Sequence, residues 1–119
     1  MAVEKVLDIT DDIIADGRAT LNVGGWDKVI IQLITPTATA SFTTTSDGGS
    51  ITGVSDGSAA SATNFTTLSG VKLSDASAVT SISAGAGDSV EFTRFDSYIR
   101  VMGPGLSVAK AFARLYKIN

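Results

Sequence analysis

A chain of 119 residues is long enough for one domain with a single hydrophobic core and too short for two. Its 9 basic and 12 acidic residues give a net charge of -3 without any run of lysine or arginine, which excludes a protein that binds nucleic acid through its phosphates. The absence of cysteine and histidine excludes a disulfide scaffold, the usual zinc sites and a histidine-activated nucleophile.

The first third of the chain predicts three strands. Residues 3–10 alternate in polarity, as in a strand with one buried face, and an acidic pair ends the pattern. Residues 18–23 form a second strand with alternate side chains directed inward. Residues 29–34 are apolar on both faces and rich in β-branched side chains, which indicates a central strand that ends at Pro36.

The middle of the chain is rich in threonine, serine and glycine and predicts thinner strands. Residues 37–45 form one strand, and the Ser-Asp-Gly-Gly turn that follows predicts a hairpin with residues 50–54. Residues 56–64 are expected to form a long flexible loop. Residues 65–73 and 78–83 are weaker strands, the first interrupted by a glycine.

The end of the chain predicts three further strands. Residues 89–95 alternate clearly, with Val90 and Phe92 directed into the core. Two long strands over residues 97–118 are then expected to fold back at Gly103-Pro104-Gly105. Proline presets the φ angle of the second turn position, and glycine accepts the positive φ of the third position in a type II turn.

The last ten residues leave two interpretations open. Alanine and leucine alternate with larger or charged side chains over residues 109–118, which indicates a strand. Val108, Phe112 and Leu115 also fall at helical spacing, and the segment is rich in good helix formers. The strand is the favoured interpretation.

These elements predict an all-β chain, a single antiparallel β-sandwich over residues 1–119. About eight to ten short strands at roughly 8 to 12 residue spacing, without a convincing helix, are typical of a sandwich with jelly-roll or immunoglobulin-like strand order. Both strand orders remain open at this point.

Three residues are candidates for an interface or a ligand platform: Trp26, Arg100 and Tyr116. Trp26 lies at a strand start, where core packing, a subunit interface and a sugar-stacking platform are the alternatives. Arg100 is interpreted as a framework arginine paired to Asp96 or Asp88, or as a charge presented to a partner.

No catalytic, cofactor or metal site is predicted, and the chain is not expected to be an enzyme. Four aspartates near the N-terminus supply oxygen atoms that could bind calcium, but their spacing differs from an EF-hand loop, and a solvated acidic turn is favoured. They are Asp8, Asp11, Asp12 and Asp16. No apolar run approaches the roughly 20 residues that span a bilayer, and the start lacks the features of a signal peptide, so synthesis in the host cytoplasm and no membrane partner are expected.

Two segments carry a family resemblance. The sequence Ala-Ser-Phe-Thr-Thr-Thr-Ser-Asp-Gly-Gly over residues 40–49 is followed later by Ser-Tyr-Ile-Arg-Val over residues 97–101, a glycine-containing turn and an alanine-rich closing strand. With residues 26–34 as the preceding strand, this order resembles the small β-sandwich structural modules of tailed-bacteriophage virions over about three quarters of the chain.

The resemblance implies a non-enzymatic virion structural protein, most directly a head decoration or cement protein that binds the capsid lattice. The implied partners are the major capsid protein or other virion components and further copies of the same chain, in a homo-oligomer located in the virion. A tail or neck module is the alternative within this class. A carbohydrate-binding β-sandwich module with an exposed aromatic platform is the competing class, and a cellular structural domain without a ligand is the third.

Overall fold

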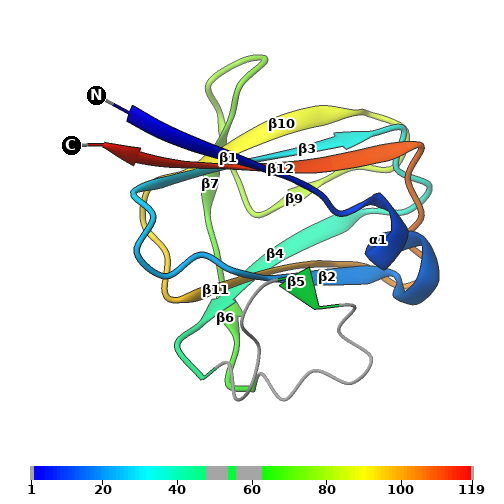
Figure 1. Cartoon of the computed structure of the whole chain (residues 1–119). Helices are drawn as coiled ribbons and strands as arrows, with labels where there is room; N and C mark the ends of the chain where they lie inside the picture. The colour runs from blue at the N-terminus through cyan, green and yellow to red at the C-terminus, as the bar shows by residue number, and fades with distance from the viewer. Residues whose placement is uncertain (1, 48–53, 56–62, 119) are drawn as a thin grey trace.

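The computed structural model describes residues 2–47, 54–55 and 63–118, which form two antiparallel β-sheets packed face to face (Figure 1). Sheet A contains, in spatial order, β1 (Ala2–Asp8), β12 (Lys110–Ile118), β3 (Lys28–Ile34), β10 (Asp88–Phe92), β7 (Gly70–Lys72) and β8 (Ala78–Val79). Sheet B contains β5 (Val54–Ser55), β2 (Arg18–Asn22), β11 (Tyr98–Met102), β4 (Ala40–Thr45) and β6 (Thr66–Thr67), and β9 (Ser81–Ile82) also pairs with β4. The predicted all-β sandwich is confirmed.

The strand order is that of a jelly roll. β1 pairs with β12, β2 with β11, β3 with β10 and β4 with β9, while successive strands of each arm lie in opposite sheets. The chain is therefore one long hairpin wound around the core, which is the jelly-roll arrangement. Strands β5 to β8 belong to the long insertion between β4 and β9, and they extend the margins of both sheets.

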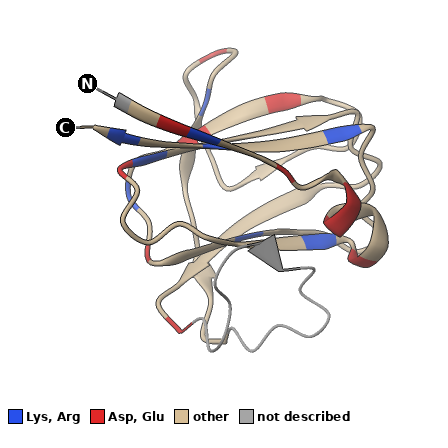
Figure 2. Ribbon diagram, viewed as in Figure 1, with Lys and Arg blue, Asp and Glu red and all other residues tan. Residues whose placement is uncertain are grey.

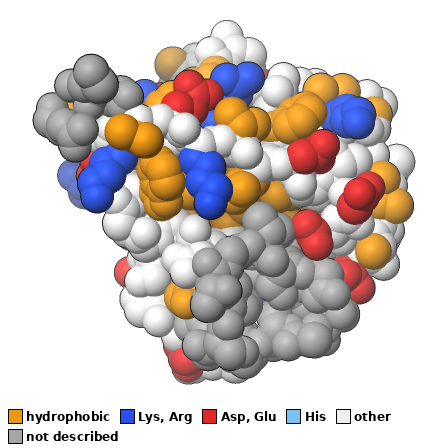
Figure 3. All heavy atoms as spheres, in the orientation of Figure 1, with side chains coloured by type: hydrophobic (Ala, Val, Ile, Leu, Met, Phe, Trp, Pro, Cys, Tyr) orange, Lys and Arg blue, Asp and Glu red, His pale blue; other side chains and the backbone are white. Residues whose placement is uncertain are grey.

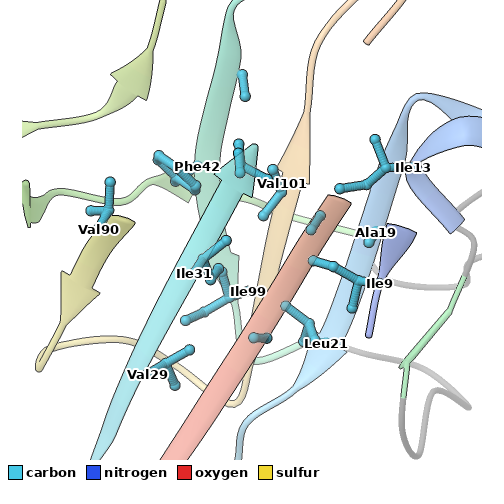
Figure 4. Packing of buried hydrophobic residues seen from close by; sticks show 14 of the residues in the cluster. Ile9, Ile13, Ala19, Leu21, Val29, Ile31, Phe42, Val90, Ile99 and Val101 are labelled. Atoms are coloured by element: carbon cyan, nitrogen blue, oxygen red, sulfur yellow. The ribbon is translucent and has the colours of Figure 1, made fainter. Parts of the chain in front are cut away.

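The core lies between the sheets and is built from alternate residues of the long strands (Figure 4). Val29, Ile31 and Leu33 of β3 are fully buried, as predicted for a central strand, and their neighbours on the other face of β3 are half-buried. Val90 and Phe92 of β10 enter the same core, also as predicted.

The N-terminal region differs from the prediction in two ways. β1 is the edge strand of sheet A, and its side chains from Val3 to Asp8 are exposed except for a half-buried Leu7, so it lacks a buried face. A helix, α1 (Thr10–Asp16), follows where none was predicted. It buries Ile13, and Gly17 ends it at a φ angle of +69°, with the N–H of Gly17 donating to the carbonyl of Ile13 at 2.7 Å.

Helix α1 was not predicted because seven residues give only two turns, too few for a periodic signal. The four-residue spacing of Ile9 and Ile13, both fully buried, was the available sign. No helix in the described part of the chain has the length and apolar character needed to cross a membrane.

The predicted hairpin after β4 is wrong at the residues that can be checked. Val54 pairs with Leu21 of β2, so β5 lies at the margin of sheet B, with β2 and β11 between it and β4. Residues 48–53 of that hairpin, and residues 56–62 of the predicted flexible loop, lie outside the described residues. Thr63 forms a bridge to Asp47.

Each of the two weak strands in the middle of the chain is divided between the sheets. The segment predicted over residues 65–73 forms β6 in sheet B and β7 in sheet A, and the segment over residues 78–83 forms β8 in sheet A and β9 in sheet B. The interruption predicted near Gly70 therefore marks a crossing between sheets.

The two terminal strands are confirmed, and the helical alternative for residues 109–118 is wrong. Ala111, Ala113 and Leu115 are buried in alternation with exposed or half-buried neighbours. The strands do not form a hairpin with each other, because β11 lies in sheet B and β12 in sheet A. The predicted turn does exist: the N–H of Leu106 donates to the carbonyl of Gly103 at 3.0 Å, and Gly105 has a φ of +68°.

Candidate functional site

A pocket opens at one end of the sandwich, where three connections of the jelly roll meet. These are residues 23–27 between β2 and β3, residues 93–97 between β10 and β11, and the residue after β4. The pocket has a volume of about 230 Å³. Its described lining residues are Val23, Gly24, Gly25, Trp26, Ser46, Phe95, Asp96 and Ser97.

Hydrogen bonds donated by backbone N–H groups hold the walls of this pocket in place. The N–H of Val23 donates to the carbonyl of Ser97 at 2.8 Å, and the N–H of Trp26 donates to the carbonyl of Val23 at 3.1 Å. The N–H of Asp96 donates to the hydroxyl of Thr44 at 2.9 Å. The connections are thus tied to each other and to β4, so the pocket is formed before any ligand arrives.

The pocket combines aromatic and hydrogen-bonding groups. Trp26 and Phe95 are half-buried and pack against the core cluster. No described residue forms a hydrogen bond with the carboxylate of Asp96 or the hydroxyls of Ser46 and Ser97. Trp26 is therefore neither fully enclosed in the core nor a flat exposed platform, since it forms part of a concave wall.

Arg100 lies on the outward side of sheet B, away from this pocket. Its Nε donates to the hydroxyl of Thr20 at 2.8 Å, and its guanidinium carbon lies 4.1 Å from the ring centroid of Phe65. Only 9% of the residue is exposed. Burial, followed by the nearby positive charge of Arg18, lowers the pKa of Arg100. Among the described residues, the buried Nε of Arg18 and hydroxyl of Thr43 have no hydrogen-bond partner.

The predicted pairing of Arg100 with Asp96 or Asp88 is not observed. Asp88 lies 3.9 Å from the ammonium of Lys72 in sheet A, and Asp96 lines the pocket. The strand register places Arg100 between Thr20 and Thr43, both uncharged. The guanidinium of Arg100 is therefore contacted by a hydroxyl and an aromatic ring instead of a carboxylate.

Tyr116 lies on the outer face of sheet A, the side directed away from sheet B. Its β12 position faces Glu4 on one side and Lys28 on the other, and the Lys28 ammonium lies 4.9 Å from its ring centroid. The adjacent row runs across five strands. In spatial order it contains Val6, Arg114, Ile30, Glu91 and Val71.

The outer face of sheet A mixes apolar side chains with paired charges. Arg114 lies 3.0 Å from Glu4, and Lys28 lies 3.8 Å from Glu91. Val6 is 50% and Val71 42% exposed, whereas Ile30 and Tyr116 are half-buried. Opposite charges occur side by side along β1 and β12 in the ribbon view (Figure 2), and the space-filling view shows hydrophobic side chains between them (Figure 3).

The acidic N-terminal residues do not form a metal centre. No group of three or more acidic side chains in residues 2–47, 54–55 and 63–118 is placed to hold a metal ion. Asp8 instead accepts hydrogen bonds from the hydroxyl and the N–H of Thr10, at 2.5 and 3.0 Å, and these bonds lower the pKa of its carboxyl.

The fold distributes the three predicted site residues over three surfaces. Trp26 lines the pocket, Arg100 lies on sheet B, and Tyr116 lies on sheet A. The sequence interpretation missed Phe95 and Asp96, which join Trp26 in the pocket. Their position between two strong strands was the available signal, but only the strand order reveals that their loop meets the one that carries Trp26.

Comparisons with known proteins give one informative likeness. No protein-family model matches the chain, and no curated protein matches it. Among solved structures, the chain is similar to the SPBc2 prophage-derived protein YomS, with a TM-score of 0.69 and 10% sequence identity over 98% of this chain and 96% of that one. At this identity the likeness concerns the fold alone.

Proposed function

We propose that this chain is a non-enzymatic structural protein of a phage virion, and most directly a decoration or cement protein that binds the capsid lattice. The observation that carries the proposal is the likeness to a prophage-derived protein over nearly the full length of both chains. The jelly roll adds support by analogy, since this fold recurs in viral capsid proteins and also in lectins. Because a fold alone does not determine a function, the proposal also rests on the properties of the chain's surfaces.

The outer face of sheet A is the docking surface in this proposal. It is rigid because its strands are paired in register, and it presents Val6, Tyr116 and Val71 between charges that already neutralise one another. Three acidic residues on this face, Glu4, Asp8 and Glu91, equal three basic ones, Lys28, Lys110 and Arg114, so the face is neutral although the chain carries a net charge of -3. A neutral surface of this kind can bury apolar area without charge repulsion from a partner.

The exposed edge of β1 is part of the same surface. An edge strand presents unpaired backbone groups that can pair with another chain, and charged side chains such as those of Glu4 and Lys5 limit unspecific pairing. In the proposed assembly, the capsid lattice and neighbouring copies of the chain cover this edge. The chain acts by burying surface and clamping adjacent subunits, without chemical turnover.

The test uses particles assembled from the encoding phage genome with the gene for this chain deleted. Purified chain is added back, and bound copies are counted against the major capsid protein by quantitative mass spectrometry. Saturable binding to heads, with heads that resist heating better when coated, is the expected result. Binding confined to tails or necks would replace the decoration role by the tail role, and no binding to any particle would overturn the proposal.

A further inference from the structure

We infer that the pocket formed by Val23, Gly24, Gly25, Trp26, Ser46, Phe95, Asp96 and Ser97 binds a single sugar ring. This site is distinct from the outer face of sheet A, and the inference does not depend on a role in the virion. The pocket walls come from three connections that the jelly roll brings to one end of the sandwich.

The walls are mainly polar with a small apolar part, and a pyranose offers hydroxyls and C–H groups to both. Trp26 and Phe95 are half-buried against the core and supply the smaller, apolar part of a mainly polar wall, which can contact one edge of the C–H face of a sugar. Asp96 supplies a carboxylate that no described residue hydrogen-bonds, and it can accept bonds from two adjacent hydroxyls. The hydroxyls of Ser46 and Ser97 both donate and accept, as the hydroxyls of a sugar do.

The size and charge of the pocket further limit the classes of ligand that it can bind. A volume of about 230 Å³ is below the roughly 300–1,000 Å³ of sites for drug-sized ligands, so the pocket holds one ring and leaves an oligosaccharide to extend into solvent. None of its described lining residues is basic, which disfavours a phosphate or carboxylate ligand. A guanidinium or ammonium group would satisfy Asp96, but it is much smaller than the pocket and would leave the serine hydroxyls unused.

Hydrogen bonds hold the loops of the pocket in place before a ligand binds. The lower entropic cost of binding makes even a weak affinity measurable. Val23, Trp26 and Asp96 are each held by a backbone hydrogen bond of 2.8 to 3.1 Å. Ligand binding therefore does not have to order the loops, which removes one of the usual entropic costs of association.

The experiment is an NMR titration of the intact chain with methyl glycosides of glucose, galactose, mannose and N-acetylglucosamine. At least one glycoside is expected to shift the Trp26 indole N–H and the amides of Gly25 and Ser97 in a saturable way, with millimolar affinity. Methylguanidine is titrated in parallel as the cationic probe. No saturable shift with any glycoside, or saturation by methylguanidine alone, would overturn the inference.

Two variants and one control locate the site. Asp96→Asn keeps the shape of an exposed side chain and should weaken glycoside binding about tenfold, because hydrogen bonds to an ionised acceptor are lost. Trp26→Ala should abolish detectable binding, with its amide spectrum checked for an intact fold. Tyr116→Ala, an aromatic truncation on the outer face of sheet A, should leave the affinity unchanged. Unchanged affinity in Asp96→Asn would contradict the assigned pocket even if Trp26→Ala failed to fold.

Discussion

The ring of Phe42 in β4 meets the ring of Phe92 in β10 edge to face, with centroids 5.0 Å apart and an interplanar angle of 63°. The two residues come from opposite sheets and both are fully buried. This pair therefore joins the sheets in the core of the sandwich, at a distance typical of favourable aromatic contacts.

Truncation of this pair should be strongly destabilising and non-additive. Phe42→Ala and Phe92→Ala are each expected to lower the free energy of unfolding by about 3–5 kcal/mol, because each leaves a cavity in a fully buried site. A double-mutant cycle measured by chemical denaturation should give a coupling of about 0.5–1.5 kcal/mol. Strict additivity would show that the rings do not interact.

The turn between the sheets depends on two glycines for different reasons. A Cβ on Gly103 would collide with the backbone carbonyl of Thr39, so Gly103→Ala should cost about 1–3 kcal/mol or more as the backbone shifts. A Cβ on Gly105 would meet open space, but its φ of +68° disfavours alanine by about 1–2 kcal/mol. Thermal unfolding of both variants should rank Gly103→Ala as the less stable, and the reverse order would contradict the close approach of Thr39.

Thr10 ties the N-terminal helix to the closing strand. Its hydroxyl accepts the buried N–H of Ala111 at 3.0 Å and donates to Asp8 at 2.5 Å. Thr10→Val keeps the shape but leaves that N–H unpaired, which should cost about 1–3 kcal/mol in denaturant unfolding. Thr10→Ser retains the hydroxyl and should recover most of the loss; if it is as unstable as Thr10→Val, the hydrogen bond is not the cause.

The same contact predicts a pH dependence. The hydroxyl and the N–H of Thr10 lower the pKa of Asp8 below its ordinary value of 3.8. Because the folded pKa is depressed, the stability contributed by this carboxylate is present above the ordinary pKa and is lost as the pH falls through the folded pKa. NMR titration should place the Asp8 carboxyl below 3.8 in the wild type and closer to it in Thr10→Val. The stability gap between wild type and Asp8→Asn should narrow in acid, and a gap that widens would contradict this sign.

The proposed docking face can be tested with matched exposed residues. Val6→Gln and Tyr116→Ala alter the outer face of sheet A, whereas Ile14→Gln alters α1, and Ile14 is as exposed as Val6 at 54% against 50%. The first two should weaken binding to gene-deleted particles at least about tenfold. Ile14→Gln should bind as the wild type does. Equal effects of all three would point to a general loss of solubility instead of a docking face.

Sequence periodicity was sufficient to predict the strands that have one face in the core. The alternation in β10 and β12 is visible in the sequence because each strand buries every second side chain, whereas β11 also buries Arg100 between the core residues Ile99 and Val101. The sequence did not reveal which strands pair with each other. β11 and β12 flank a correctly predicted turn, yet they belong to different sheets. A turn between sheets and a turn within a hairpin use the same residues, so local chemistry does not distinguish them.

The candidate site was predicted only in part for the same reason. Trp26 stood out as the lone tryptophan, but its partners Phe95 and Asp96 lie about 70 residues away in a loop that only the jelly-roll pairing brings near. Arg100 stood out within Tyr-Ile-Arg-Val, and its neighbours Thr20 and Phe65 depend on strand order and on the inserted segment. Contacts that depend on pairing between distant strands leave no short-range pattern.

The most direct test of the proposed virion role is quantitative mass spectrometry of purified particles of the encoding phage, combined with a reconstruction of the head. The proposal predicts that this chain is present in a fixed ratio to the major capsid protein and that a jelly roll lies on the head surface with the outer face of sheet A toward the lattice. Absence of the chain from purified, infectious particles would contradict it.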